Sequence, residues 1–195
     1  MKKSLSLLLV FMMTLSGCSA NLIDLKSNLT EAQVQSSDDE PSAKFAKLIK
    51  PFGLSDVDLR VDGKDNEILG AMIDENTLEV LAFAGEVDIV EDYADYIFVD
   101  VSGMSKTEEQ EVIDGFEEVC DRFKDLSYCS INLGYFDDTI ILLSLEFIDL
   151  DNVDNLNDVI KRGGVQATSS SDKLPTYLRL SGSAENLVNN GYIKR

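Results

Sequence analysis

Short apolar runs separated by turn residues fill the second half of the chain and predict a set of strands. The runs are rich in β-branched and aromatic residues, or they alternate apolar with polar positions as half-buried strands do. They cover residues 78–83, 87–90, 96–101, 128–135, 139–148 and 177–180. Asp137-Asp138 predicts a tight turn that joins two of these strands in a hairpin. Upstream, hydrophobic positions in residues 52–76 follow neither a helical nor a strand spacing. In this stretch Asp62-Gly63 and Asp65-Asn66 predict turns.

Apolar positions spaced by three and four residues predict helices between these strands. Ser105, with Glu108 three residues later, has the pattern of a capping box and predicts a helix that runs to about Lys124. Its apolar stripe consists of Val112, Ile113, Phe116, Val119, Cys120 and Phe123. Shorter helices are predicted over 43–50, 152–162 and 183–190, and a polar loop over 167–172.

The order of these elements predicts the fold class. Strands are grouped around helices and do not strictly alternate with them, which is typical of an α+β fold. We therefore expect an antiparallel sheet with helices packed mainly on one face. Residues 42–195 are expected to form a single domain, because a chain of 195 residues with 44% hydrophobic content can build one packed core.

The first residues have the pattern of a secretory signal. Lys2 and Lys3 precede an apolar run that is too short to span a bilayer, and small residues follow it. Leu15-Ser16-Gly17-Cys18 then resembles the lipobox of bacterial lipoproteins. In that family the Cys thiol receives a diacylglyceryl group and the signal is cut before it. The resemblance implies that residues 1–17 are a lipoprotein signal peptide and that Cys18 is the lipidation site. The alternative is an ordinary signal peptide in which Cys18 has no special role.

Residues 18–41 are polar and predict a flexible tether between this lipid and the domain. The expected location is the extracytoplasmic face of the cell membrane, or the outer membrane if the cell has one. Loss of residues 1–17 removes two Lys and no acid, so the net charge of −19 becomes −21. Anionic lipid repels such a chain, and only the lipid is expected to hold it at the membrane.

Composition excludes several classes of function. The chain has no His, which removes His-dependent nucleophilic relays and His-ligated metal sites. An excess of 36 Asp and Glu over 17 Lys and Arg argues against binding to nucleic acid. Neither a Gly-rich phosphate loop nor a nucleophile motif is present. We expect no cofactor and no enzymatic activity.

Several short motifs occur in a recognisable order over roughly the last 110 residues. They are Gly103-Met104-Ser105-Lys106-Thr107-Glu108, Tyr135-Phe136-Asp137-Asp138, Ile148-Asp149-Leu150 and Leu187-Val188-Asn189-Asn190-Gly191-Tyr192. With them, residues 86–195 resemble the YehR-like family of small bacterial lipoproteins, which carry a domain of unknown function. The resemblance implies a location and a fold. It implies no activity.

Two cysteines are candidates for a disulfide. Cys120 lies on the buried stripe of the predicted helix and Cys129 on the apolar face of the next strand, so packing of one on the other would bring them together. Outside the cytoplasm such a bond persists, and it would stabilise the fold by roughly 2–3 kcal/mol. The alternative is that both are small buried hydrophobic residues.

A run of acids after the last long strand suggests a weak calcium site, and no other metal site is expected. Its candidate ligands are Asp149, Asp151 and Asp154, since carboxylate oxygens are preferred by Ca²⁺. The run departs from a calcium-binding EF-hand loop at its sixth and twelfth positions. The alternative is that Asp151 or Asn152 caps the following helix.

These features favour a non-catalytic binding or interaction module. The first alternative is a structural or envelope-maintenance protein that acts through a protein partner. The second is a hydrolase that uses paired carboxylates, such as Asp137-Asp138, Glu117-Glu118 or Glu91-Asp92. The expected partners are an envelope protein or a small ligand.

Overall fold

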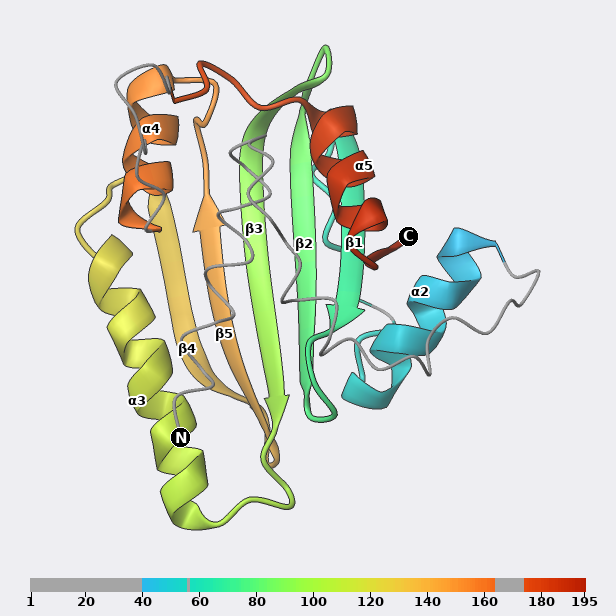
Figure 1. Ribbon diagram of the computed structural model, residues 1–195, viewed down its shortest axis with the longest axis vertical. Coiled ribbons are helices and arrows are strands. Elements are labelled where there is room, and N and C mark those ends of the chain that lie inside the picture. Colours follow the sequence, from blue (N-terminus) through green and yellow to red (C-terminus); the bar gives the residue numbers. More distant parts are fainter. Residues whose placement is uncertain (1–39, 56, 164–173) are drawn as a thin grey trace.

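A computed structural model describes residues 40–55, 57–163 and 174–195; the predictions for residues 1–39 and 167–172 fall outside these ranges. Within them, strands form one antiparallel sheet in the order β4-β5-β3-β2-β1-β6 (Figure 1). The strands are β1 (Asp65–Met72), β2 (Thr77–Glu86), β3 (Ile89–Asp100), β4 (Cys129–Asp137), β5 (Ile140–Phe147) and β6 (Ile193–Lys194).

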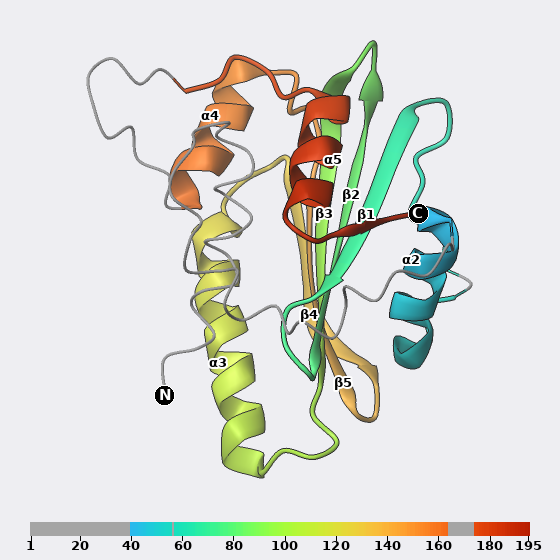
Figure 2. The same ribbon diagram turned by 45° about the vertical axis from the view of Figure 1, so that its right-hand side comes forward.

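The helices cover the two faces of this sheet unequally. They are α2 (Pro41–Ile49), followed by the 3-10 turn η4 (Lys50–Phe52), then α3 (Lys106–Phe123), α4 (Val153–Arg162) and α5 (Leu180–Asn189). Figure 2 shows α3, α4 and α5 on one face and α2 on the other. The predicted α+β fold, with helices mainly on one face, is confirmed.

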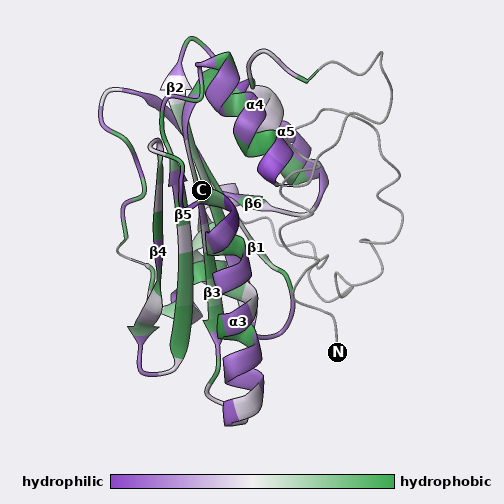
Figure 3. Ribbon diagram, turned by 90° about the vertical axis from the view of Figure 1, so that its left-hand side faces the viewer, coloured by the Kyte–Doolittle hydropathy of each residue, from purple (hydrophilic) through white to green (hydrophobic). Residues whose placement is uncertain are grey.

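The larger core lies between the sheet and the face that carries α3, α4 and α5. Rings pack there across neighbouring strands and onto α3: the Phe83 and Tyr93 ring centroids are 4.9 Å apart, and those of Phe123 and Phe147 are 5.4 Å apart. In Figure 3, α3 is mostly hydrophilic in colour, whereas β5 is mostly hydrophobic. The apolar side of the amphipathic helix α3 thus packs on the apolar face of the sheet.

A second core lies under α2 and η4 on the opposite face. Phe45, Ile49 and Phe52 are buried there against β1, β2 and β3. Gly70 of β1 permits the close approach, since a Cβ at that position would lie 3.0 Å from the Phe45 ring. Both faces of β2 are therefore covered, and only its last residue is exposed.

The capping box at the start of α3 is confirmed. The Ser105 main-chain N–H donates to Glu108 Oε2 at 2.8 Å, and the Glu108 N–H donates back to Ser105 Oγ at 3.3 Å. The helix then ends at Phe123, one residue short of the expected end. The start of α3 was predictable because Ser105 and Glu108, the two residues that form its cap, are close in the sequence.

Three strand-and-turn predictions were wrong. Residues 87–90 are not a separate strand: Val87 and Asp88 form a two-residue turn with φ of 50° and 64°, the left-handed geometry that matches the twist of a tight hairpin, and Ile89 and Val90 begin β3. Asp65-Asn66 is not a turn but the start of β1, because pairing with Gly85 and Ala84 of β2 extends the strand. Residues 177–180 form no strand beyond a bridge between Arg179 and Ile89, and α5 begins at Leu180.

Gly85 should be intolerant of any side chain. A Cβ there would lie 1.7 Å from the main-chain oxygen of Ile89, at an irregularity in the pairing of β2 with β3. We expect Gly85→Ala to lower the free energy of unfolding by about 3 kcal/mol. Gly103→Ala is the matched control, because a Cβ at Gly103 meets nothing within 4 Å. Urea denaturation of both variants checks the difference, and an equal effect of the two would contradict this packing.

Candidate functional site

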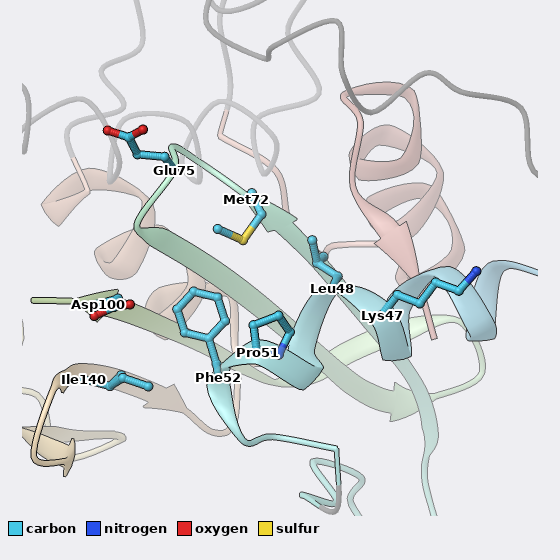
Figure 4. A pocket seen from close by; sticks show the side chains of 8 residues that line it. All are labelled: Lys47, Leu48, Pro51, Phe52, Met72, Glu75, Asp100 and Ile140. Carbon is cyan, nitrogen blue, oxygen red and sulfur yellow. The ribbon is translucent and has the colours of Figure 1, made fainter. Parts of the chain in front are cut away.

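A groove of about 350 Å³ opens on the sheet face that carries α2 (Figure 4). Helix α2 and η4 form one wall, and the sheet supplies the rest from the β1–β2 turn, the end of β3 and the start of β5. The lining residues are Lys47, Leu48, Pro51, Phe52, Met72, Glu75, Asp100 and Ile140. Its volume lies at the lower end of the range for pockets that bind small molecules.

The groove is apolar along its length and carries charges at its ends. Leu48, Phe52 and Met72 line the middle, and the Phe52 ring is held in place 6.5 Å from that of buried Phe98. Glu75 and Asp100 lie toward one end, away from Lys47 (Figure 4). Asp100 Oδ1 accepts the Ser102 N–H at 2.9 Å, which orients this carboxylate. Such an arrangement suits an amphipathic molecule with a cationic group.

Two carboxyl groups lie inside the larger core, on the face opposite the groove. Glu79 of β2 and Asp95 of β3 are 0% and 1% exposed. Asp95 is paired with Leu81, so the two acids are diagonal neighbours on one face of adjacent strands. The hydroxyl of Tyr192 donates to Glu79 Oε2, whereas neither oxygen of Asp95 has a hydrogen-bond partner among the described residues.

Burial favours the neutral form of both acids. It raises the pKa of Glu79 to about 7, although the hydrogen bond from Tyr192 opposes the shift. Burial also raises the pKa of Asp95 well above its usual range, and the neighbouring Glu79 adds to this. Solvent does not reach either group, so we interpret the pair as part of the core and not as a catalytic dyad.

Two of the three acid pairs noted in the sequence contain carboxylates with structural contacts in the fold. Glu91 and Asp92 form ion pairs with Lys64 at 2.8 and 2.6 Å. Asp137 Oδ1 accepts main-chain N–H groups of the β4–β5 turn, those of Thr139 and Ile140. Glu117 and Glu118 are exposed on α3. Neither these pairs nor the buried acids line the groove.

Cys120 lies on α3 and Cys129 is the first residue of β4, near enough for Cys120 to influence the pKa of Cys129. Both are free thiols in this structure, and both are partly exposed. Burial raises the pKa of the Cys129 thiol to about 12, and the nearby Cys120 contributes to the shift. The disulfide between them stays a prediction.

The acids proposed as calcium ligands surround the start of α4. Asn152 is its N-cap and accepts the Asp154 N–H at 3.0 Å. Asp149 has a φ of 56° and its main-chain oxygen accepts from the Asn155 side chain, and Asp151 lies in the turn between. Among the described residues, no group of three or more Cys, Asp or Glu is arranged to hold a metal ion. A helix cap accounts for this run.

The proposed lipidation site, Cys18, lies outside the described residues, as does the lipobox. In the part of the chain that the structure describes, no helix has the length and apolar character needed to cross a bilayer.

The groove and the buried acids were not predicted from the sequence. Met72 and Glu75 fall in the stretch that showed no clear period, and Asp100 and Ile140 come from separate strands. The acids did leave a signal, because Glu79 interrupts an otherwise apolar run from Leu78 to Phe83. A single acid within a strand that is apolar on both of its faces indicates a carboxyl group in the core.

Comparison with one solved structure supports a shared fold. No protein-family model matches the chain, and no curated protein matches it. The NMR structure of the E. coli YehR protein is 14% identical, with a TM-score of 0.51, and the match covers 69% of this chain and 93% of that one. The NMR structure of a protein from Streptococcus pneumoniae TIGR4 is 11% identical, with a TM-score of 0.45, covering 71% and 89%. The resemblance to YehR is thus supported at the level of the fold.

The buried acids predict an unusual pH dependence of stability. Because the pKa of Glu79 is raised in the folded state, its contribution is most favourable below its ordinary pKa of 4.5 and is lost as the pH rises toward about 7. This loss amounts to roughly 3 kcal/mol. The raised pKa of Asp95 extends the decline to higher pH.

Asp95→Asn should therefore stabilise the protein at pH 7.5 and flatten the decline. The amide keeps the size of the carboxyl group and carries no charge that must be buried. Urea denaturation at pH 4.5, 6.0 and 7.5 measures both effects. Asp114→Asn, at an exposed position of α3, is the control for the general loss of negative charge. Equal stabilisation by the two variants would contradict the inference that ionisation of the buried Asp95 destabilises the folded protein.

Proposed function

We propose that this chain is a lipid-anchored extracytoplasmic lipoprotein whose folded part is a non-catalytic binding module. The observation that carries the binding role is the groove beside α2 and η4, which combines an apolar length with carboxylates at one end. The lipobox at Leu15-Ser16-Gly17-Cys18 supports the anchor. At a net charge of −21 without residues 1–17, the mature chain would be repelled by anionic lipid, so the acyl chains alone would hold it.

The ligand we propose for the groove is a small amphipathic molecule with an ammonium group. Its apolar part would lie along Met72, Leu48 and Phe52, and its cationic end near Asp100 and Glu75. The chain as a whole carries a net charge of −19, which adds to the attraction of a cation and disfavours anionic ligands.

The positions of the acids support a non-catalytic role over hydrolysis. Glu79 and Asp95, the pair with strongly raised pKa values, are enclosed in the core on the other face of the sheet. A carboxylate that acts as a base or nucleophile must be ionised and reach its substrate. The alternative of a role through a protein partner needs a docking surface, and β4, the outermost strand at one side of the described sheet, offers a candidate.

Removal of one groove carboxylate should weaken the binding of a cation. We expect phenethylammonium to shift the NMR signals of the Met72 and Ile140 methyl groups, and Asp100→Asn to lower its affinity about fivefold, or ~1 kcal/mol. The full chain carrying Cys18→Ser avoids complications from the lipid. Asp114→Asn again serves as the charge control, and 3-phenylpropionate tests the sign of the ligand. Equal binding of the two ligands would contradict the proposed chemistry.

Loss of the Cys18 thiol should release the protein from the membrane. Without a diacylglyceryl group, no described helix could retain the chain in a bilayer. We expect Cys18→Ser to abolish the incorporation of a labelled fatty acid and to move the protein to the soluble fraction. Cys129→Ser, at a partly exposed thiol within the domain, should leave both unchanged. Labelling that persists in Cys18→Ser would overturn the lipobox assignment.

A further inference from the structure

The two edges of the sheet differ in how they are closed. The edge at β1 is covered by the C-terminal residues: β6 pairs with Leu69 and Gly70, and the Arg195 N–H donates to the Ile68 oxygen at 2.9 Å. The opposite edge is the nine-residue strand β4, which among the described residues pairs with β5 alone. Edge strands usually carry Lys or Pro, which block pairing with another chain. The sequence of β4, CSINLGYFD, contains neither.

The register shows which main-chain groups of β4 face outward. The Ile148 N–H donates to the Tyr128 oxygen at 3.0 Å, and the register of β4 with β5 places these two residues opposite each other. Hydrogen-bonded and non-hydrogen-bonded pairs alternate along antiparallel strands. Ser130, Asn132 and Gly134 therefore bond to β5. The N–H and C=O groups of the residues between them, Ile131, Leu133 and Tyr135, point away from the sheet.

These outward groups are open to another chain. Within residues 40–55, 57–163 and 174–195, no partner is found for the outward main-chain groups of Ile131 and Leu133. The residues on either side of them, Ser130, Asn132 and Gly134, are exposed. Figure 3 views the molecule from this edge and shows α3 beside β4 and not across it. An extended segment can therefore reach the strand.

The negative charge around the β4 edge favours a partner segment that carries positive charge. Helix α3 runs beside β4 and carries seven carboxylates against two basic side chains (Figure 1). Its Glu109 accepts a hydrogen bond from the Tyr135 hydroxyl, which ties the acidic helix to the edge strand. Exposed Glu146 on β5 and Asp138 in the hairpin turn add negative charge. A second copy of this chain, at a net charge of −19, would bring like charges together, whereas a basic segment would be attracted.

We propose that the free edge of β4 docks an extended, basic segment of another protein, which adds a strand to the sheet. Main-chain hydrogen bonds to Ile131, Leu133 and Tyr135 supply the affinity, and the acids of α3 supply the preference for Lys and Arg. This surface is separate from the groove. A failure here leaves the groove and its ligand untouched, and a failure of the groove leaves this edge intact.

The test uses the full chain carrying Cys18→Ser and two synthetic peptides. One is an eight-residue peptide in which Lys alternates with Val and Thr, and the other has Glu in place of every Lys. We expect only the Lys peptide to protect the amides of Ile131 and Leu133 from hydrogen exchange, with an affinity that falls at least threefold between 50 and 200 mM salt. Protection by both peptides, or by neither at 1 mM, would overturn the proposal.

Two sets of variants separate the main-chain contacts from the charge. Leu133→Pro removes an outward N–H, a replacement that edge strands tolerate, and should lower affinity at least tenfold relative to the matched Leu133→Ala. Glu117→Gln with Glu118→Gln should lower it about threefold, whereas Glu86→Gln with Glu185→Gln, the same charge change outside α3 and β4, should not. If Leu133→Pro fails to fold by circular dichroism, the paired charge variants decide.

Self-association is the remaining outcome. Sedimentation of the chain without peptide should show a monomer with exchanging Ile131 and Leu133 amides. A concentration-dependent dimer in which those amides are protected would overturn the proposal and identify a second copy as the occupant.

Discussion

The structure depends on covering both faces of β2. This strand runs through the middle of the sheet, and nine of its ten positions are buried. On one face α5 closes over it, and on the other the Phe45 ring reaches the sheet where Gly70 leaves room. The two covers come from opposite ends of the described chain, since α2 begins at residue 41 and α5 ends at residue 189. The central strand therefore holds both ends of the domain.

Burial of both faces of β2 encloses an ionisable side chain, which is unfavourable. Glu79 is enclosed on the same face as Leu81 and Phe83, and Asp95 joins it from β3. The hydrogen bond from Tyr192 partly satisfies Glu79 and connects the end of the chain to the sheet centre. A buried carboxyl group with few partners is tolerated mainly in its neutral form. Stability and the protonation of the core are thus linked in this domain.

Coverage of the outer strands is less complete, and the candidate binding surfaces lie there. Helix α2 and η4 cover β1, β2 and part of β3, so the groove forms where their cover ends near Asp100 and Ile140. Farther out, α3 runs beside β4, and among the described residues no strand pairs with the outer edge of β4. The groove has carboxylates at one end, and the helix beside β4 is rich in acids, because many of the acids occupy exposed turns and helix faces.

The sequence by itself determined the elements whose signals are local. The Ser105–Glu108 capping box located α3, and the apolar pattern of residues 128–148 located the β4–β5 hairpin, because the interactions that form these elements join near neighbours. The α+β class followed from their order. Tertiary structure decided what depends on distant partners: β1 formed through pairing with β2, and Val87-Asp88 became a turn because β2 and β3 extend to meet it. It also decided the groove and the open edge of β4, since each is made by segments that only the packed sheet brings together or leaves apart.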